Sequence, residues 1–385
     1  MRVLHTSDWH LGRSFHKESL LSAQGVFVDH LIDTVRGQSV DAVVVSGDVY
    51  DRALPPVDAV RLCHEALQRL SAEGVATVVI SGNHDSALRL GFLAGLVDRA
   101  GVHLRTDPAR VGEPVTVKGV AFYAIPYLEP DLVKEPYGLA ERSHAAALGH
   151  AMSLVRADLA ARPGPSVVLA HAFVTGGVAS DSERDISVGG VAHVPAEVFA
   201  GTDYVALGHL HGRQCVSETV RYSGSPLAYS FSEAGQVKGT WLIDLGEPGS
   251  GPGSASGSGP VRAEFVPAPV PRPVSVREGT LDELLTGARH TPYEEHWLHV
   301  VITDPVRPRA AMERLRQRFP HTLSLAFESD GARQAPARAP RTAGRAELDI
   351  ARDFVREVRG EPADDAETRL LDEALRQFRL QEVTG

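Results

Sequence analysis

The segment Asp41-Ala-Val-Val-Val-Ser-Gly-Asp-Val-Tyr-Asp51 decides how the rest of the chain is interpreted. It joins a short run of β-branched residues, which is typical of a buried strand, to a Gly-Asp turn and a second aspartate. The run is too short for a helix of ordinary length, and two carboxylates follow it directly. We therefore interpret the segment as a buried strand that carries acidic side chains to the edge of a sheet.

Four further apolar runs end in polar clusters of the same kind. Open α/β sheets place their chemistry in the loops beyond the carboxyl ends of the strands, so these clusters are expected to meet. The side chains that follow the five runs are Asp8, His10, Asp48, Asn83, His171, His209 and His211. Imidazole, carboxylate and amide oxygen without thiolate suit manganese, iron or zinc more than calcium. The sequence therefore predicts a centre for two divalent metals, which needs one bridging carboxylate.

The composition describes an ordinary soluble globular protein of two or three domains, with 385 residues, 43% hydrophobic and 23% charged. Cys63 and Cys215 are the only cysteines, which excludes a disulfide framework and favours a reducing, cytoplasmic location. No stretch approaches a membrane span, and Met1 leads directly into the first strand, so we expect neither a membrane nor a secretory location. The net charge of −10 argues weakly against nucleic acid, although a local basic face would suffice for DNA.

The first ~130 residues alternate between strands and helical patterns, which is the signature of βαβ units in a layered α/β core. The helical patterns lie around Val26–Val35, Val60–Leu70 and Ala87–Ala100. A second set of strands follows, with an Ala-rich helix over roughly Ala145–Ala161 among them. The expected strands are Val115–Val117, Val120–Ile125, Val167–Ala170, Tyr204–Leu207 and Thr240–Leu245. We predict two stacked sheets that share the metal ligands at one edge.

Composition shifts divide the chain into four parts. Residues 1–270 form the main domain, with a flexible Gly/Ser/Pro loop at 246–260 that could join Thr240–Leu245 to a returning strand at Val261–Val266. Residues 274–330 form a small βαβ-type domain, and 331–345 form a basic linker. Residues 346–383 form a helical tail.

The tail carries apolar stripes that have no evident mate inside the chain. Phe354, Leu371 and Phe378 belong to these stripes and are candidates for binding a partner protein. The alternative is that both tail helices fold back on the protein's own core.

The ordered motifs Asp-x-His, Gly-Asp-x-x-Asp, Gly-Asn-His-Asp, a lone His after a strand, and Gly-His-x-His resemble the calcineurin-like metallophosphoesterase superfamily. Within it, the chain is similar to the nuclease subunits of bacterial ATP-linked exonucleases. The segments Thr6–Gly12, Asp181–Arg184 leading to Val188–Gly190, and Tyr222–Leu227 carry this closer resemblance, which extends over nearly the whole chain.

The resemblance implies a ligand set for each metal. Asp8, His10, Asp48 and His211 would hold one ion; Asp48, Asn83, His171 and His209 would hold the other. It also implies manganese as the metal, Asp48 as the bridge, and direct attack of an activated hydroxide on a phosphodiester without a covalent intermediate. His84 would stabilise the developing charge or protonate the leaving oxygen, with Asp51 or Asp85 orienting its ring.

The same resemblance implies the biological setting. It predicts a two-sheet sandwich flanked by helices, a small domain that caps DNA, and a tail that docks on a partner ATPase. The expected assembly is a homodimer within a heterotetramer, with a dimer contact near Val60–Leu70. The expected activity is exonuclease action on duplex ends and endonuclease action on single strands or hairpins. DNA repair, recombination and replication would be its setting, in the cytoplasm and on the nucleoid when DNA is bound.

Two other functions compete with this interpretation. A phosphoesterase for small nucleotides or phosphoproteins would share every ligand, but would not need the small domain or the tail. A non-catalytic tether for DNA ends would be expected to have lost ligands, and all seven are present. The basic residues beside the motifs either position a phosphate backbone or lie in ordinary solvated loops. They are Arg13, Lys17, Arg52 and Arg89.

Overall fold

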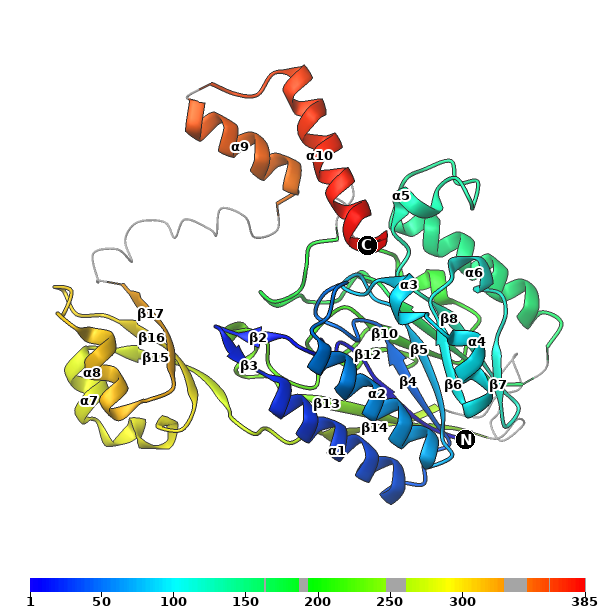
Figure 1. Cartoon of the computed structure of the whole chain (residues 1–385), viewed down its shortest axis with the longest axis horizontal. Helices are drawn as coiled ribbons and strands as arrows, with labels where there is room; N and C mark the ends of the chain where they lie inside the picture. Colours follow the sequence, from blue (N-terminus) through cyan, green and yellow to red (C-terminus); the bar gives the residue numbers. More distant parts are fainter. Residues whose placement is uncertain (163, 187–192, 247–260, 329–344, 360, 385) are drawn as a thin grey trace.

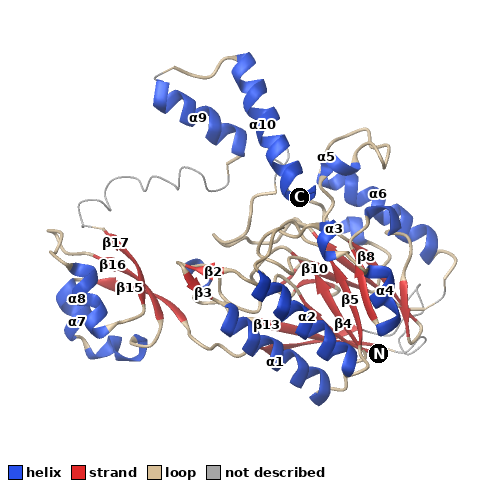
Figure 2. Cartoon of the chain, viewed as in Figure 1, coloured by secondary structure: helices blue, strands red, loops and turns tan. Residues whose placement is uncertain are grey.

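A computed structural model of the chain describes residues 1–162, 164–186, 193–246, 261–328, 345–359 and 361–384. Two six-stranded sheets pack face to face, and helices cover the outer faces (Figure 2). The predicted α/β class with two stacked sheets and flanking helices is confirmed. Among the described residues, no helix combines the length and the apolar character needed to cross a membrane.

The first sheet has the order β14-β13-β1-β4-β5-β6. Its strands are β1 (Arg2–Thr6), β4 (Ala42–Ser46), β5 (Ala76–Ile80), β6 (Val102–Arg105), β13 (Gly239–Leu245) and β14 (Val261–Pro267). Strands β1, β4, β5 and β6 run parallel, and β13 and β14 complete the sheet with antiparallel pairings. Helices α1 (Leu21–Gly37) and α2 (Val57–Ala72) are the crossovers that parallel pairing requires.

The second sheet has the order β11-β12-β10-β9-β8-β7. Its strands are β7 (Val115–Val117), β8 (Val120–Ile125), β9 (Ser166–His171), β10 (Tyr204–Gly208), β11 (Gln214–Cys215) and β12 (Val220–Tyr222). The four central strands are parallel, and α6 (His144–Leu159) joins β8 to β9. Because the central strands of each sheet are parallel, their carboxyl ends lie at one edge of that sheet, where connecting loops follow.

Side-chain alternation along each strand builds three apolar layers. On β1, Val3 joins the core between the sheets, whereas Leu4 joins the core under α1 and α2. On β8, Phe122 faces the first sheet and Tyr123 faces the α6 side. Because both faces of each sheet are covered, the central strands read as continuous apolar runs, which is why the sequence shows them clearly.

Three local expectations differ from the structure. Strand β13 belongs to the first sheet, beside β1, rather than to the second set of strands. The pattern at Ala87–Ala100 breaks into α3 (Ala87–Leu90), α4 (Ala94–Val97) and a 3₁₀ turn, because Leu93 adopts a positive φ of 65° between the helices. Strand β6 follows at once and was not expected. Its four residues are too few for alternation to be distinctive.

The small domain is a parallel sheet of β15 (Val274–Gly279), β16 (Trp297–Ile302) and β17 (Thr322–Phe327). Helices α7 (Leu281–Thr286) and α8 (Ala311–Arg318) cover its apolar face. Figure 1 shows it beside the hairpin of β2 (Ser14–Phe15) and β3 (Glu18–Ser19). The βαβ pattern expected for this part is present as β16, α8 and β17, and β15 and α7 are additions.

The tail consists of α9 (Glu347–Arg359) and α10 (Asp365–Thr384), which pack against each other. Helix α10 also contacts α3 and α5 (Pro130–Val133) of the main domain, as Figure 1 shows. The basic linker lies almost wholly outside the described residues, as does the Gly/Ser/Pro loop. Short 3₁₀ turns complete the description: η1 (Asp98–Ala100), η2 (Pro108–Arg110), η3 (Ala196–Phe199), η4 (Phe231–Glu233) and η5 (Ala288–Tyr293).

Candidate metal centre

The candidate ligands all lie where central strands end or in the loops that follow. Asp8 and His10 follow β1, Asp48 follows β4, and Asn83 follows β5. His171 is the last residue of β9, and His209 and His211 follow β10. Both sheets therefore contribute, and all seven side chains are buried.

Sharp backbone turns direct these side chains inward. Asp8, His10, Asp48 and His209 have positive φ angles of 53°, 43°, 48° and 104°, a region that non-glycine residues rarely adopt. Backbone hydrogen bonds from Asp8 N to Gly47 O (3.0 Å) and from His10 N to Asp48 O (2.9 Å) lock the first two loops together. The turns are thus held by the neighbouring strand end.

Two glycines of the motifs lie so close to neighbouring atoms that a Cβ would not fit. A Cβ on Gly82 would overlap Asp48 Oδ1, and a Cβ on Gly47 would lie 2.5 Å from His171 Nδ1. Gly47 also has a φ of +90°. The glycine before Asp48 and the glycine before Asn83 therefore let the loops of β4 and β5 pack against the ligands themselves.

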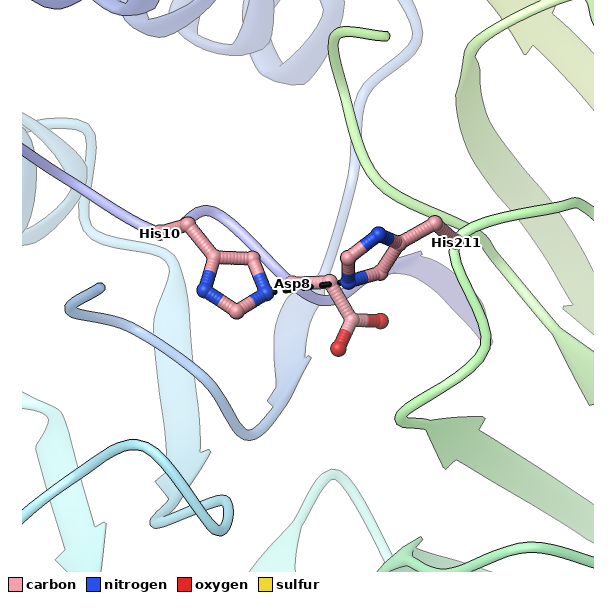
Figure 3. Close-up of side chains that lie close together, drawn as sticks. All are labelled: Asp8, His10 and His211. Atoms are coloured by element: carbon pink, nitrogen blue, oxygen red, sulfur yellow. Dashed lines mark hydrogen bonds between the residues drawn. The ribbon is translucent and has the colours of Figure 1, made fainter. Parts of the chain in front are cut away.

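The first ligand cluster comprises Asp8, His10 and His211 (Figure 3). The Nε2 atoms of His10 and His211 face each other at 3.0 Å. At most one of two facing imidazole nitrogens can donate a proton to the other, whereas a cation between them satisfies both lone pairs. The donor set therefore fits a divalent metal.

The second ligand cluster is centred on Asn83. Its Oδ1 lies 2.9 Å from His171 Nε2 and 3.2 Å from His209 Nδ1. One amide oxygen and two imidazole nitrogens converge, which is again a set that suits a transition metal.

Asp48 lies between the two clusters. Its Oδ2 is 3.5 Å from His10 Nε2 and 3.5 Å from His171 Nε2, which are one imidazole from each cluster. Its Oδ1 accepts the backbone N–H of His84 at 2.9 Å. A carboxylate in this position can bridge two cations. The ligand division stays a prediction, because Asp8, Asp48 and His171 also lie within ligand distance of one another, across the two clusters.

Groups behind the ligands set their orientation. His171 Nδ1 lies 2.9 Å from the carbonyl oxygen of Ser46, which can only accept, so the ring presents Nε2 to the centre. The backbone N–H of His209 donates to Asp8 Oδ1 at 3.0 Å, which ties the loop of β10 to that of β1.

His84 lies beside the ligands, with its ring centroid 4.7 Å from that of His10. Its Nδ1 faces the backbone carbonyl of Asp51 at 2.8 Å, so Asp51 orients it through the main chain rather than through its carboxylate. The Asp85 carboxylate turns instead to the backbone N–H groups of Gly82, Val49 and Tyr50, at 2.8–3.0 Å. Asp85 thus braces the loops of β4 and β5.

Burial and charge shift the protonation of the ligands. Burial raises the pKa of Asp8 to about 6. Burial alone would lower the pKa of His171, but the neighbouring Asp48 carboxylate raises it to about 9. Asp48 also loses solvation, yet the charge of His171 brings its pKa well below the ordinary value. Burial lowers the pKa of His10 and His209 well below normal.

These shifts predict that metal uptake releases protons. Asp8 becomes an anion only above about pH 6, and His171 keeps its proton up to about pH 9 in the metal-free protein. A cation must displace that proton, so apparent affinity should rise from pH 6 to 9, with about one proton released at pH 7.5. Titration calorimetry in buffers of different ionisation enthalpy measures the number released. Affinity that stays flat over this range would contradict the prediction.

The metal-free fold should respond to pH in the opposite way. A histidine whose pKa is raised on folding contributes stability below its unfolded value, and that contribution is lost as the pH rises toward about 9. Thermal unfolding at pH 6 and pH 9, with and without metal, should therefore show opposite trends.

A group of polar residues lies behind His211, and the sequence did not reveal its role. Ser182 Oγ lies 2.5 Å from His211 Nδ1 and donates to Glu233 Oε1. Glu233 is buried and accepts from Lys238, which is also buried. Ser182 belongs to a segment that the sequence resemblance marked, but Glu233 and Lys238 lie in η4 and the loop after it, where no periodic pattern draws attention.

The four basic candidates are placed differently. Arg13 is largely buried and donates to the Asp51 carboxylate (3.2 Å) and to the Ser182 carbonyl (3.1 Å), which makes it a structural link. Lys17, Arg52 and Arg89 are exposed near the loops of β1, β4 and β5. These three remain candidates for phosphate contact.

The three partner-binding candidates differ in how exposed their side chains are. Phe354 on α9 is 65% exposed, and Leu371 is half-buried. Phe378 on α10 is 56% exposed, yet it lines a cavity of about 50 Å³ together with Asn83, Tyr127 and Arg184. Helix α10 thus lies close to the second ligand cluster.

Comparison with known proteins assigns the two parts of the chain separately. The family model described as calcineurin-like phosphoesterase matches residues 1–213, which is more than half of the chain. The SbcD_C model, described as type 5 capsule protein repressor C-terminal domain, matches residues 270–359.

Two solved structures show similarity at low identity. One is the calcineurin-like phosphoesterase YfkN from Bacillus subtilis, with 12% identity, 69% of this chain and 90% of that chain covered, and a TM-score of 0.40. The other is TT1561 of Thermus thermophilus, with 12% identity, 58% and 89% covered, and a TM-score of 0.37. The family assignment rests on the two family matches: the chain belongs to the calcineurin-like phosphoesterase family, and its C-terminal match supports an SbcD-type nuclease subunit.

Proposed function

We propose that the chain is the metal-dependent DNA nuclease subunit of an exonuclease complex and works with an SbcC-type ATPase. The observation that carries the proposal is the convergence of seven candidate ligand side chains from both sheets, in a chain whose C-terminal part matches the SbcD_C family model. The first feature supports phosphoester hydrolysis, and the second supports DNA as the substrate.

The two clusters would hold a pair of divalent ions, for which we propose manganese. When bound, such a pair neutralises the phosphate charge and activates water at neutral pH. Asp8, His10 and His211 would hold one position, and Asn83, His171 and His209 would hold the other, with Asp48 shared. The buried loops exclude bulk water from the ligands, which strengthens every charge interaction at the centre.

His84 is the proposed proton-transfer residue. Because the Asp51 carbonyl accepts from Nδ1, the Nε2 atom is the one free to accept or return a proton. Burial lowers the pKa of His84, which keeps the free imidazole neutral until a charged substrate is present. Nε2 can then donate to the leaving oxygen or to the developing negative charge.

The surroundings favour a long substrate over a small one. An open cleft of about 570 Å³ lies where the small domain meets the β2–β3 hairpin and the segment around η4, with His16, Phe231 and His299 among its lining residues. Exposed Lys17 lies in the turn of that hairpin. A strand crossing this cleft would meet imidazole and aromatic rings that can stack on bases and a cation that can contact phosphate.

The decisive experiment compares substrates at equal metal concentration. The protein with Mn²⁺ is assayed on duplex DNA ends, single strands and hairpins, and in parallel on cyclic nucleotides and a phosphopeptide, with and without the ATPase subunit. We expect DNA cleavage to dominate and the ATPase with ATP to increase it. Turnover of only the small substrates would replace the nuclease by a phosphoesterase. Binding of DNA ends without any cleavage would favour the tether.

The tail is the proposed attachment to the ATPase. Phe354 projects from α9 into solvent, whereas Phe378 faces the main domain. Phe354 is therefore the residue to replace in a test of ATPase binding. Phe354→Asp should weaken ATPase binding by about 10-fold or more, as expected for an aromatic anchor, and leave basal DNA cleavage unchanged. Val306→Asp on the exposed surface of the small domain is the control. Sedimentation analysis of the mixed subunits measures the effect, and unaltered association of the Phe354 variant would locate the contact elsewhere.

A homodimer within a heterotetramer is also proposed. Leu54, Val57, Leu88 and Phe92 are exposed on the loop before α2, on α2 and around α3. Arg89 reaches the Ala53 carbonyl at 3.5 Å, so the two segments are neighbours. An exposed apolar patch of this kind is typical of an interface. Replacing Leu88 and Phe92 by serine should convert a dimer to a monomer in sedimentation velocity.

A further inference from the structure

The contacts around His211 form a chain of hydrogen bonds with a fixed direction. Ser180 Oγ donates to Glu183 Oε2 at 2.6 Å, and Ser182 Oγ donates to Glu233 Oε1. A hydroxyl has one proton, so the Ser182 oxygen can only accept from His211 Nδ1, which lies 2.5 Å away.

This direction decides which nitrogen of His211 has the free lone pair. If Nδ1 carries the proton and donates it to Ser182, Nε2 is left unprotonated. Nε2 is the atom that faces His10 Nε2 at 3.0 Å, inside the first ligand cluster. The opposite tautomer would place an N–H where a cation must bind.

A buried ion pair holds the far end of the chain. Glu233 is 1% exposed and Lys238 is 4% exposed, and the ammonium donates to Glu233 Oε2. Lys238 also donates to the His211 carbonyl oxygen at 2.7 Å and to Ser225 Oγ at 3.0 Å. An ionised carboxylate accepts hydrogen bonds and cannot donate, so the pair prevents the chain from reversing.

The backbone of His211 is held on its other side as well. Its N–H donates to Glu183 Oε1 at 2.7 Å, while its carbonyl accepts from Lys238. Taking a Glu–Lys pair out of water is costly, and packing a loop does not require one. The cost is understandable if the pair sets the orientation and protonation of a ligand.

We propose that Ser182 and Glu233 form a relay that fixes the Nδ1–H tautomer of His211 and thereby prepares Nε2 for the metal. Both are positioning residues, and Lys238 keeps the relay in place. The proposal rests on the proposed metal centre, but it concerns the metal-free protein and does not depend on the substrate being DNA.

The test measures the tautomer directly. Metal-free protein labelled with ¹⁵N-histidine is studied by two-bond ¹H–¹⁵N correlation, which distinguishes a protonated from an unprotonated ring nitrogen. We expect His211 to carry its proton on Nδ1 in the parent protein and to become a mixture of tautomers in Ser182→Ala. Ser182→Thr retains a hydroxyl and should restore the Nδ1–H form.

Metal affinity provides the second readout. Loss of a hydrogen-bond partner behind a ligand typically lowers metal affinity about 10–100-fold, and we expect this for Ser182→Ala in Mn²⁺ titrations, with recovery in Ser182→Thr. Ser153→Ala is the matched control, because its hydroxyl bonds only to the His150 carbonyl on α6 among the described contacts. Glu233→Gln should act like Ser182→Ala. Glu233→Gln leaves Lys238 buried beside a neutral amide, so the thermal unfolding of this variant is measured too. If Glu233→Gln does not fold, the result for Ser182→Ala decides the test.

An unchanged tautomer and unchanged affinity in Ser182→Ala would overturn the relay. A protein that binds Mn²⁺ and shows the tautomer shift but cleaves no DNA would contradict the proposed nuclease activity alone. The two failures are therefore distinguishable.

Discussion

Replacing Asp48 by asparagine is expected to abolish hydrolysis, with a loss on the order of 10³-fold or more, and to remove both metals. Asp48 Oδ2 lies 3.5 Å from one imidazole of each cluster, so in the proposed centre both metal positions would depend on the same carboxylate. Two cations close together repel each other, and the shared negative charge offsets that repulsion. Asparagine keeps the shape of the side chain, and its amide oxygen can still accept the backbone N–H of His84.

Metal content after equilibration with Mn²⁺ is the direct measurement for this variant, with cleavage of a phosphodiester as the second. The control is Asp33→Asn, which changes the same group on an exposed part of α1. A variant that retains two metals and full turnover would remove Asp48 from the bridging position. Thermal unfolding of the metal-free protein shows whether the fold survives.

Replacing His84 by glutamine should have the opposite signature, with metals retained and turnover reduced about 10²–10⁴-fold. His84 is held by the Asp51 carbonyl through Nδ1, and its hydrogen bond to Asp48 comes from its backbone N–H. The ligand set therefore does not require its imidazole. The loss should appear in kcat rather than in KM, because the proton is transferred during the chemical step.

The matched control for this variant is His64→Gln on the exposed face of α2. Metal stoichiometry, kcat and KM are measured for both variants. Undiminished cleavage would exclude His84 from the mechanism. Loss of one metal would instead make it a ligand, which the close approach of His10, Asp48 and His84 permits geometrically.

The strands that deliver the candidate ligands were predictable because they are buried on both faces. The runs at β4, β5 and β10 are mostly apolar and end in polar clusters, so neither their position nor their direction was ambiguous. The sheet membership of β13 was not predictable, because antiparallel pairing to β1 is a long-range contact that leaves no local pattern. The division of α3 from α4 depends on the positive φ of Leu93, which its residue type does not suggest.

The candidate site was also predictable only in part. Ligand types at strand ends predicted which side chains converge, and the structure brings all seven candidates together. The orientation of His84 by a main-chain carbonyl was beyond prediction, because every residue has such a carbonyl. Glu233 and Lys238 were missed for a different reason. They lie near the centre only because the loop after β12 (Val220–Tyr222) returns to His211.

The positive φ angles at Asp8, His10, Asp48 and His209 have a consequence for laboratory evolution. A left-handed conformation costs a residue with a Cβ about 1–2 kcal/mol, which glycine does not lose. Glycine at these positions would relieve backbone strain and delete a buried ligand at the same time. A library screened for heat resistance in the presence of a chelator should therefore accumulate inactive glycine variants at these four positions. A screen with manganese in the medium should retain the parent residues.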